Sequence, residues 1–344
     1  MSNILDCTIR DGSYATNYQW DSKDLEDIVS ALSDIGIKYI EIGNGTGLGA
    51  YRNINNALDD DSYIKHTIPF KGLSYIGAFF IPGVGTKEDM LKFRDKGGDF
   101  IRIGTNATET EKSIAYIEYG KKIGFKVFCN LMKTYAISEY KLAYRSYDII
   151  KAGVDCIYIV DSAGGMLPSQ VASYFKSMKK LYSIELGFHG HNNLLLANAN
   201  SLTAIENGAE YVDSTLMSLG RGAGNAQTES LVALLQKAKL IDTNLSVSKL
   251  ADLSQSIISR ISNRLAGSSK RDIFIGIANF HDSNLPLVEK YSKQYNVNQE
   301  ILIEEVSKIN VVNPSEELFE LAAKKISEGV KEIVFFPKFS HQKY

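Results

Sequence analysis

An alternation of short apolar segments with longer segments of helical periodicity limits most strongly what this 344-residue chain can fold into. The apolar segments are rich in β-branched and aromatic residues, which favour strands. They cover residues 4–12, 39–43, 73–80, 100–103, 126–131, 156–160, 185–188 and 211–215. Apolar residues recur at helical spacing over residues 22–35, 111–123, 137–152, 169–181 and 195–207. This order predicts an α/β fold in which strands and helices take turns.

Glycines mark the points where the predicted helices give way to strands. Asp21 or Ser22 caps the first of these helices and Gly36 ends it. The same kind of junction recurs later in the chain at Gly97, Gly124, Gly153 and Gly208. About eight strands alternating with helices match the order of a (β/α)8 TIM barrel. A doubly wound sheet would more often carry a Gly-rich phosphate loop after its first strand, and since none stands there the barrel is favoured.

The alternation stops near residue 244, which predicts two domains. Residues 1–243 would form a TIM-barrel catalytic domain, and residues 244–344 a C-terminal helical domain with helices over 245–265, 284–295, 298–309 and 315–329. Residues 273–281 read as a connecting segment that returns to the barrel mouth. The tail over residues 332–337 is apolar, so we expect it to pack on the domain or on a partner chain.

Composition excludes several kinds of partner. The net charge is −2 and no long basic run occurs, so neither nucleic acid nor an anionic membrane is expected as a partner. The chain has no apolar run of transmembrane length and no signal-peptide pattern. The three cysteines, Cys7, Cys129 and Cys156, lie in apolar segments without metal-site spacing, as expected of core thiols in a reducing compartment. We therefore expect a cytoplasmic protein.

Polar residues gather where the predicted strands end, which is where a TIM barrel places its active site. Arg10 and Asp11 follow the first strand, and His189 and His191 end the seventh. Alternate residues of a strand share a face, so both imidazoles should project together and, with Asp11, form a two-histidine, one-carboxylate metal site. This donor set suits Mn²⁺ or Mg²⁺ better than structural zinc. The alternatives are a structural Arg10–Asp11 ion pair, and one histidine that serves the core while the other is exposed.

Four motifs in order resemble those of the HMG-CoA-lyase-like superfamily of metal-dependent aldolases and acyltransferases, and most closely the class II 4-hydroxy-2-oxovalerate aldolases. They are Thr8-Ile9-Arg10-Asp11-Gly12, Asp161-Ser162-Ala163-Gly164-Gly165, His189-Gly190-His191-Asn192-Asn193 and Gly222-Ala223-Gly224-Asn225-Ala226. The resemblance implies a barrel with a C-terminal helical domain, a divalent metal and a pyruvate enolate. It assigns the metal to Asp11, His189 and His191, and the enolate oxygens to Arg10. Ser162 would help to seat a carboxylate or the acceptor, and Asn225 is either a further ligand or a loop cap.

Two positions depart from the aldolase pattern. The family's acid/base histidine follows two residues after the Arg-Asp-Gly glycine, and that position here is Tyr14. The family's tyrosine partner lies in a Gly-x-Ala-x-x-Tyr segment, which here ends in His281. We therefore predict an exchanged acid/base pair in which both residues face the metal, with His281 the base. The alternative is that Tyr14 only packs in its loop and that His281 is incidental.

The leading interpretation is a carbon–carbon lyase that joins pyruvate to an aldehyde or cleaves a 4-hydroxy-2-oxo acid. A Claisen-type synthase is the alternative, although its pattern has Glu-Gln where this chain has Ser13-Tyr14, and Asp in place of Asn193. A non-catalytic binding subunit is a third possibility. Lys133, after the fifth strand, is either a ligand for an acidic group on the acceptor or a solvated lysine. We expect a homo-oligomer, and the related aldolases suggest an aldehyde dehydrogenase partner.

Overall fold

The computed structural model of the protein describes residues 2–241, 244–258 and 267–329. Eight parallel strands close into a barrel in sequence order. The strands are β1 (Asn3–Asp6), β2 (Tyr39–Ile42), β3 (Tyr75–Phe80), β4 (Phe100–Asn106), β5 (Lys126–Met132), β6 (Cys156–Asp161), β7 (Glu185–Gly190) and β8 (Tyr211–Ser214). The predicted TIM barrel is therefore confirmed.

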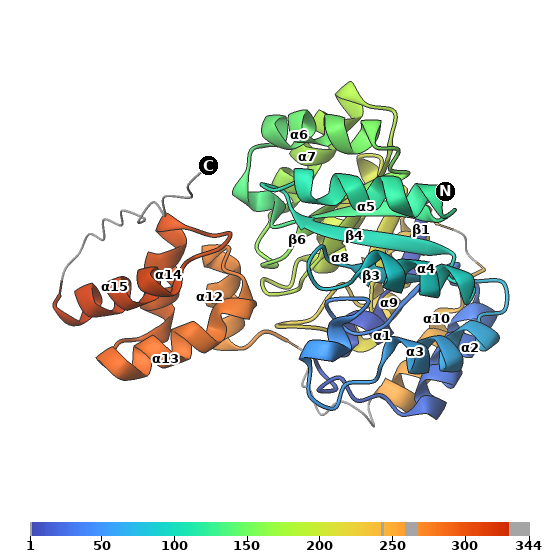
Figure 1. The fold of residues 1–344 in the computed structure, drawn as a ribbon, viewed down its shortest axis with the longest axis horizontal. Helices are drawn as coiled ribbons and strands as arrows, with labels where there is room; N and C mark the ends of the chain where they lie inside the picture. The colour runs from blue at the N-terminus through green and yellow to red at the C-terminus, as the bar shows by residue number, and fades with distance from the viewer. Residues whose placement is uncertain (1, 242–243, 259–266, 330–344) are drawn as a thin grey trace.

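Helices surround the barrel and cover its outer face (Figure 1). Those between or after the strands are α2 (Ser22–Ile35), α3 (Asp60–Thr67), α4 (Lys87–Asp95), α5 (Glu111–Lys122), α6 (Glu139–Lys151), α7 (Pro168–Leu181), α8 (Ala197–Glu206), α9 (Thr228–Lys237) and α10 (Val247–Leu253). The Asp21 carboxylate caps α2 by accepting from the Lys23 backbone N–H, and Gly36 ends it at a φ of 104°. A side chain is strained at such a positive φ, so glycine is the residue that lets the chain turn from helix to strand.

The inside of the barrel has an aromatic floor. Tyr39, Phe100, Phe128 and Tyr211 point inward from four strands, and their rings contact one another with centroids 5.1–6.4 Å apart. Two residues further along β2, β4 and β8, the inward positions hold Glu41, Arg102 and Asp213. A layer of charged side chains therefore lies on the aromatic floor, beneath the barrel mouth.

The C-terminal helices form a separate body beside the barrel (Figure 1). They are α12 (Lys270–Ala278), α13 (Leu285–Tyr295), α14 (Gln299–Ile309) and α15 (Glu316–Ser327), and their buried apolar residues make a second core. By contrast, Leu250 and Leu253 of α10 belong to the core of the barrel. The domain boundary at residue 243 stays a prediction. Residues 259–266 of the predicted helix and the apolar tail lie outside the described residues.

Two sequence expectations about local structure are wrong. The first strand ends at Asp6, and Thr8–Gly12 forms a short helix, α1, instead of continuing the strand. The Asp6 carboxylate accepts from the Thr8 backbone N–H at 2.9 Å, which turns the chain out of the strand. Residues 270–278 are helical as well, because Ser269 and Asp272 form a capping box at the start of α12.

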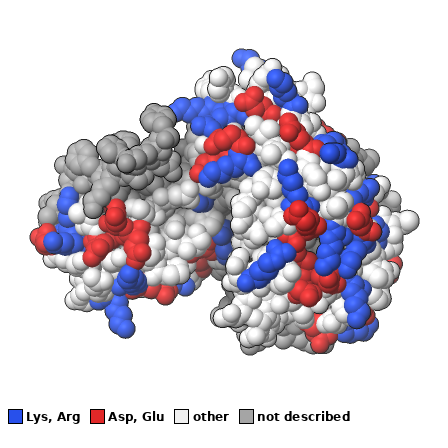
Figure 2. Space-filling view, viewed as in Figure 1, with Lys and Arg blue, Asp and Glu red and all other residues white. Residues whose placement is uncertain are grey.

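The surface carries both signs of charge. On the face shown in Figure 2, lysine and arginine side chains are interspersed with aspartate and glutamate, and a hollow separates the helical body from the barrel. Within the described ranges, no helix has both the length and the apolar character needed to cross a membrane.

Candidate active site

Helix α1 places Arg10 and Asp11 at the barrel mouth. Arg10 donates from Nε to the Glu41 carboxylate at 2.7 Å and from NH1 to Asp11 at 2.9 Å. Its guanidinium also lies over the Phe79 ring, 4.9 Å from the centroid. Because Arg10 and Asp11 are 6% and 1% exposed, this pair is fixed in place rather than solvated. The predicted Arg10–Asp11 ion pair is present, and it lies within the cavity.

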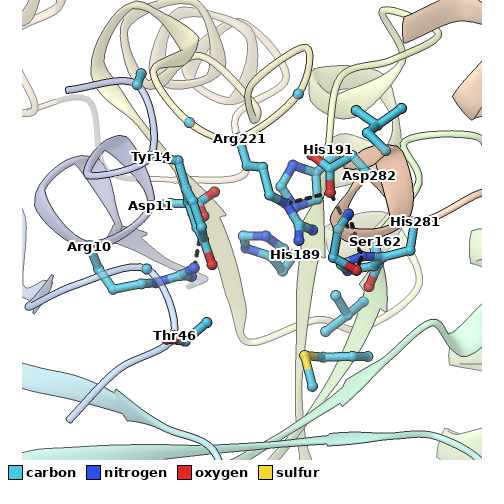
Figure 3. A pocket seen from close by; sticks show the side chains of 18 of the residues that line it. Arg10, Asp11, Tyr14, Thr46, Ser162, His189, His191, Arg221, His281 and Asp282 are labelled. Atoms are coloured by element: carbon cyan, nitrogen blue, oxygen red, sulfur yellow. Dashed lines mark hydrogen bonds and ion pairs between the residues drawn. The ribbon is translucent and has the colours of Figure 1, made fainter. Parts of the chain in front are cut away.

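Strand β7 brings the two histidines to the same place. His189 lies on β7, His191 follows the strand by one residue, and their ring centroids are 5.1 Å apart. Ligand atoms of Asp11, His189 and His191 all lie within 4.8 Å of one another. Figure 3 shows the three side chains converging on the centre of the cavity. Two imidazoles and a carboxylate at this spacing can hold a divalent cation, so these residues fit the metal that the sequence predicts.

The charges around this group keep it ready for a metal at neutral pH. Burial raises the pKa of Asp11, but the Arg10 guanidinium and the two imidazoles outweigh burial and hold it below the usual range. Burial lowers the pKa of His191 to about 3, against the opposing effect of Asp11. Metals bind carboxylates and neutral imidazoles, so proton competition for Asp11 and His191 is weak near pH 7.

Asn225 lies against the same group. Its Nδ2 donates to the Asp11 carboxylate, while its Oδ1 is buried without a hydrogen-bond partner. The loop that carries Asn225 forms a β-bridge to His191. An orphaned buried amide oxygen beside the carboxylate and two imidazoles is a further donor suited to a hard cation. Whether Asn225 is a ligand or a loop cap stays open.

A cavity of about 1130 Å³ opens above these residues and extends across the mouth. Lys133 and Ser162 lie on its wall, after β5 and β6, and the Ser162 hydroxyl accepts from the Lys133 backbone N–H at 3.0 Å. In a closed barrel of eight strands, β5 is opposite β1, so Lys133 faces Asp11 from across the cavity. The Lys133 ammonium donates to the Val312 carbonyl oxygen and to Asn313 Oδ1, which joins the barrel to the α14–α15 loop. Lys133 is therefore a buried cation rather than a solvated one.

Tyr14 and His281 both line the cavity, on different sides. Gly45 leaves room for Tyr14, because a Cβ there would lie 2.2 Å from the tyrosine ring. Figure 3 shows Tyr14 beside Asp11 and His281 near Ser162, with Arg221 between them. Arg221 lies 5.6 Å from the Tyr14 ring centroid and pairs with Asp282 at 3.0 Å. No hydrogen bond joins the two described residues Tyr14 and His281, so their exchanged roles stay a prediction.

Several charged residues of the site were not predicted from the sequence. Glu41, Arg102 and Asp213 connect Arg10 to His189 beneath the mouth, and Arg221 and Asp282 border the cavity. The signal available for the first three is one charged residue inside each of three apolar strands. Such a residue is costly unless it is paired, so it points to an inward-facing network.

A closed barrel that brings a carboxylate, two histidines and an arginine together at its mouth is the arrangement that the motif resemblance implies for the HMG-CoA-lyase-like superfamily, and the comparisons agree. A model of the HMGL-like family matches residues 102–257. The 4-hydroxy-2-oxovalerate aldolase of Geobacillus thermodenitrificans (strain NG80-2) is 32% identical over 95% of this chain and 98% of its own. That of Carboxydothermus hydrogenoformans is 32% identical over 96% and 98%. The chain therefore belongs to the HMGL-like family and, within it, to the group of these aldolases, which are carbon–carbon lyases.

Solved structures agree on the fold. The N-terminal domain of a Bacteroides vulgatus protein described as an aldolase superposes with a TM-score of 0.72 at 27% identity, over 85% of this chain and 98% of that one. The carboxyl transferase domain of Rhizobium etli pyruvate carboxylase superposes with a TM-score of 0.77 at 14% identity, over 96% of this chain and 61% of that one. The second likeness concerns the fold alone. The curated relatives favour the aldolase interpretation over the Claisen-type synthase and over a non-catalytic subunit.

Proposed function

We propose that the protein cleaves a 4-hydroxy-2-oxo acid into pyruvate and an aldehyde by a retro-aldol reaction, and catalyses the reverse addition. The observation that carries this proposal is the meeting of Asp11, His189 and His191 within 4.8 Å beside the buried Arg10. The names of the curated relatives at 32% identity support the same reaction.

We propose that Asp11, His189 and His191 hold Mn²⁺ or Mg²⁺, with Asn225 Oδ1 available as a further donor. A divalent cation there would act as a Lewis acid toward the 2-oxo acid. The protein's own contribution is to fix the donors. The Asp213 carboxylate accepts from His189 Nδ1 at 2.8 Å, which turns Nε2 of His189 toward the cavity.

Arg10 supplies a fixed positive charge next to the reacting 2-oxo acid. Its Nε and NH1 are occupied by Glu41 and Asp11, so NH2 remains to donate to a carboxylate or enolate oxygen. Donors held rigidly where negative charge develops lower the barrier because they need no reorganisation during the reaction. Ser162 and Lys133 lie across the cavity, where we propose that Ser162 seats the acceptor and that Lys133 faces an acidic group on it.

Cleavage requires a base and then an acid. A base takes the proton of the C4 hydroxyl, the C3–C4 bond breaks to release the aldehyde, and the resulting pyruvate enolate takes a proton at C3. We propose that His281 and Tyr14 manage these protons. Burial, together with Arg221 and Lys133, lowers the pKa of His281, so its imidazole is neutral, whereas burial raises the pKa of Tyr14 to about 12. A neutral imidazole can accept a proton at neutral pH and the phenol cannot.

Ser283 suits His281 to this task. The Ser283 hydroxyl lies 2.7 Å from Nδ1, and its backbone N–H lies 3.2 Å from the same nitrogen. The backbone N–H of Ser283 donates to Nδ1, so this nitrogen keeps its lone pair and Nε2 carries the proton of the neutral ring. For Nε2 to act as the base, the ring must first take the other tautomer, in which the Ser283 hydroxyl accepts from Nδ1–H. We propose that Tyr14, on the other side of Arg221, relays the proton or orients bound substrate.

The proposal extends to the surroundings of the enzyme. The three buried free cysteines suit a reducing compartment such as the cytoplasm. We propose a homo-oligomer and an aldehyde dehydrogenase partner that would consume the aldehyde. Sedimentation of the purified protein tests the homo-oligomer. Co-purification with an aldehyde dehydrogenase encoded by a neighbouring gene tests the partner.

Metal removal and Asp11→Asn test the reaction and the site together. Pyruvate release from a 4-hydroxy-2-oxo acid should vanish after exhaustive chelation and return with Mn²⁺ or Mg²⁺. Deuterium exchange of the pyruvate methyl group should follow the same pattern. Asp11→Asn should abolish both activities and metal retention, while Asp27→Asn on the exposed face of α2 should change neither. Full activity of the metal-free protein would refute the proposal.

A further inference from the structure

A continuous chain of buried ion pairs runs beneath the mouth from one proposed metal ligand to another. Arg10 joins Asp11 to Glu41, and Arg102 joins Glu41 to Asp213. The Arg102–Glu41 contact measures 3.0 Å, and Arg102 NH2 donates to Asp213 Oδ2. Asp213 Oδ2 also lies 2.8 Å from His189 Nδ1. We call this run, from Asp11 through Arg10, Glu41, Arg102 and Asp213 to His189, the buried ion-pair chain.

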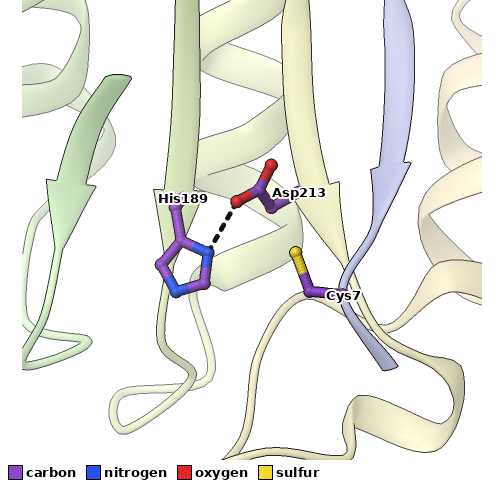
Figure 4. A group of neighbouring side chains, drawn as sticks. All are labelled: Cys7, His189 and Asp213. Carbon is purple, nitrogen blue, oxygen red and sulfur yellow. Dashed lines mark hydrogen bonds and ion pairs between the residues drawn. The ribbon is translucent and has the colours of Figure 1, made fainter. Parts of the chain in front are cut away.

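Figure 4 shows the part of the buried ion-pair chain where Asp213 meets His189. The imidazole points one nitrogen at the Asp213 carboxylate and the other away from it. A carboxylate held by Arg102 can only accept a hydrogen bond, so Nδ1 of His189 carries a proton and Nε2 is the nitrogen left to bind a metal. Asp213 therefore fixes both the tautomer and the orientation that a metal-binding imidazole needs.

Cys7, the third side chain in Figure 4, does not turn this group into a separate metal site. Its sulfur accepts from Arg102 NH1 at 3.3 Å, and the nitrogen of His189 on this side already contacts Asp213. Burial raises the pKa of the Cys7 thiol, which disfavours the thiolate that a metal requires. Cys7 packs against the buried ion-pair chain as a core residue.

The buried ion-pair chain is not arranged for stability alone. Glu41 Oε1, Asp213 Oδ1 and Arg102 Nε are buried and lack hydrogen-bond partners among the described residues. Each such atom loses its hydrogen bonds to water on folding and gains none in the protein, which destabilises the folded state. Arg10 and Arg102 both donate to the same Glu41 oxygen, which leaves the other oxygen unused. A buried ionic network that leaves polar atoms unsatisfied is weak evidence for stability and is better explained by a requirement for position.

We propose that Arg102 and Asp213 are positioning residues that hold His189, and through Glu41 and Arg10 also Asp11, at the spacing a divalent cation needs. This inference rests on the proposed metal site. Neither residue borders the cavity, so each would act only through its neighbours. The alternating charges allow three carboxylates to lie close together, because a guanidinium separates each from the next. Loss of one ion pair should therefore displace both Asp11 and His189 rather than only one of them.

Isothermal titration calorimetry, with Mn²⁺ added to the metal-free protein, measures the affinity for the ion and tests the proposal without relying on activity. Asp213→Asn, which has nearly the same shape, should weaken Mn²⁺ binding by about 10- to 100-fold. Arg102→Lys keeps the charge but cannot reach both Glu41 and Asp213, and should weaken binding by a smaller factor. Asp99→Asn is the control, because Asp99 also pairs with a cation, Lys71, and accepts from the Ile76 backbone N–H, but stands just before β4, at the end of the barrel away from the mouth.

The outcomes separate this inference from the proposed function. If the wild type binds no Mn²⁺ or Mg²⁺ at all, the proposed metal site fails and the inference fails with it. If the wild type binds Mn²⁺ and both Asp213→Asn and Arg102→Lys bind it equally well, only the inference is overturned, even if both variants melt at lower temperature. If Asp213→Asn does not fold, Arg102→Lys decides alone. An equal loss in Asp99→Asn would show a general effect of removing an ion-paired carboxylate and would also overturn it.

Discussion

Arg10→Lys is the substitution that most directly separates chemistry from structure at this site. The guanidinium contacts Glu41 at 2.7 Å and Asp11 at 2.9 Å and remains able to donate a further bond to substrate. One ammonium cannot reach both carboxylates and a substrate oxygen in the same plane. The charge is kept, so gross electrostatics barely change, and what is lost is one fixed donor toward the developing enolate. Removal of one such donor costs about 2–4 kcal/mol, which corresponds to a loss of roughly 30- to 1,000-fold in kcat.

Steady-state cleavage of a 4-hydroxy-2-oxo acid, with pyruvate release followed by a coupled assay, measures this loss. Because the interaction strengthens as the enolate forms, kcat should fall more than KM rises. The control is Arg94→Lys, since Arg94 also lies over an aromatic ring and donates a hydrogen bond, in its case to the Gly98 carbonyl oxygen, but on the outside of the barrel. It should leave kcat unchanged. An Arg10→Lys enzyme within a factor of two of wild type would place Arg10 in structure rather than in chemistry.

Three further predictions concern the cavity and the strand beneath it. His281→Ala should slow pyruvate proton exchange and cleavage together by about 10²–10⁴-fold, and Tyr14→Phe by less; the reverse order, measured by NMR exchange, would exchange the two roles. Lys133→Met should raise KM for an aldehyde bearing a carboxylate more than for a neutral one of equal size, and equal effects would confine Lys133 to its contact with Val312. Burial raises the pKa of Asp6 to about 7 from 3.8, so the folded state binds more protons than the unfolded state and stability falls as pH rises between these values. Asp6→Asn should remove that decline, so its melting temperature should exceed that of wild type by more at pH 8 than at pH 5, and an equal difference at both pH values would contradict the assignment.

The fold could be predicted because its signals are local and repeated. Each of Gly36, Gly97, Gly124, Gly153 and Gly208 adopts a positive φ at a helix-to-strand junction. Apolar strands buried on both faces and amphipathic helices then leave a closed parallel barrel as the natural arrangement. The first strand was predicted too long for an equally local reason. Thr8 and Ile9 have strand propensity, but the hydrogen bond from the Thr8 N–H to Asp6 overrides it.

The metal-ligand group could be predicted because both histidines lie on one strand and the Arg-Asp pair follows another. The support beneath it could not, because ion pairs between β2, β4 and β8 depend on barrel register. Glu41, Arg102 and Asp213 are separated by about 60 and 110 residues in sequence, yet all lie two positions beyond the aromatic floor on their strands. A single charged residue within an apolar strand does not show which residue it pairs with. Only the closed barrel shows that Arg102 pairs with both carboxylates.

The predicted acid/base pair also depends on contacts that cannot be predicted from the sequence. Motif spacing can place Tyr14 and His281 at the family's two positions, but it cannot show what lies between them. In the folded chain Arg221, which comes from the loop after β8, occupies the space between them and pairs with Asp282, the residue that follows His281. Burial and this fixed cation both lower the pKa of His281, and an anionic substrate drawn toward Arg221 would offset the effect of the cation. We therefore expect the basicity of His281 to rise when the cavity is occupied, through a charge that comes from a segment far from it in the sequence.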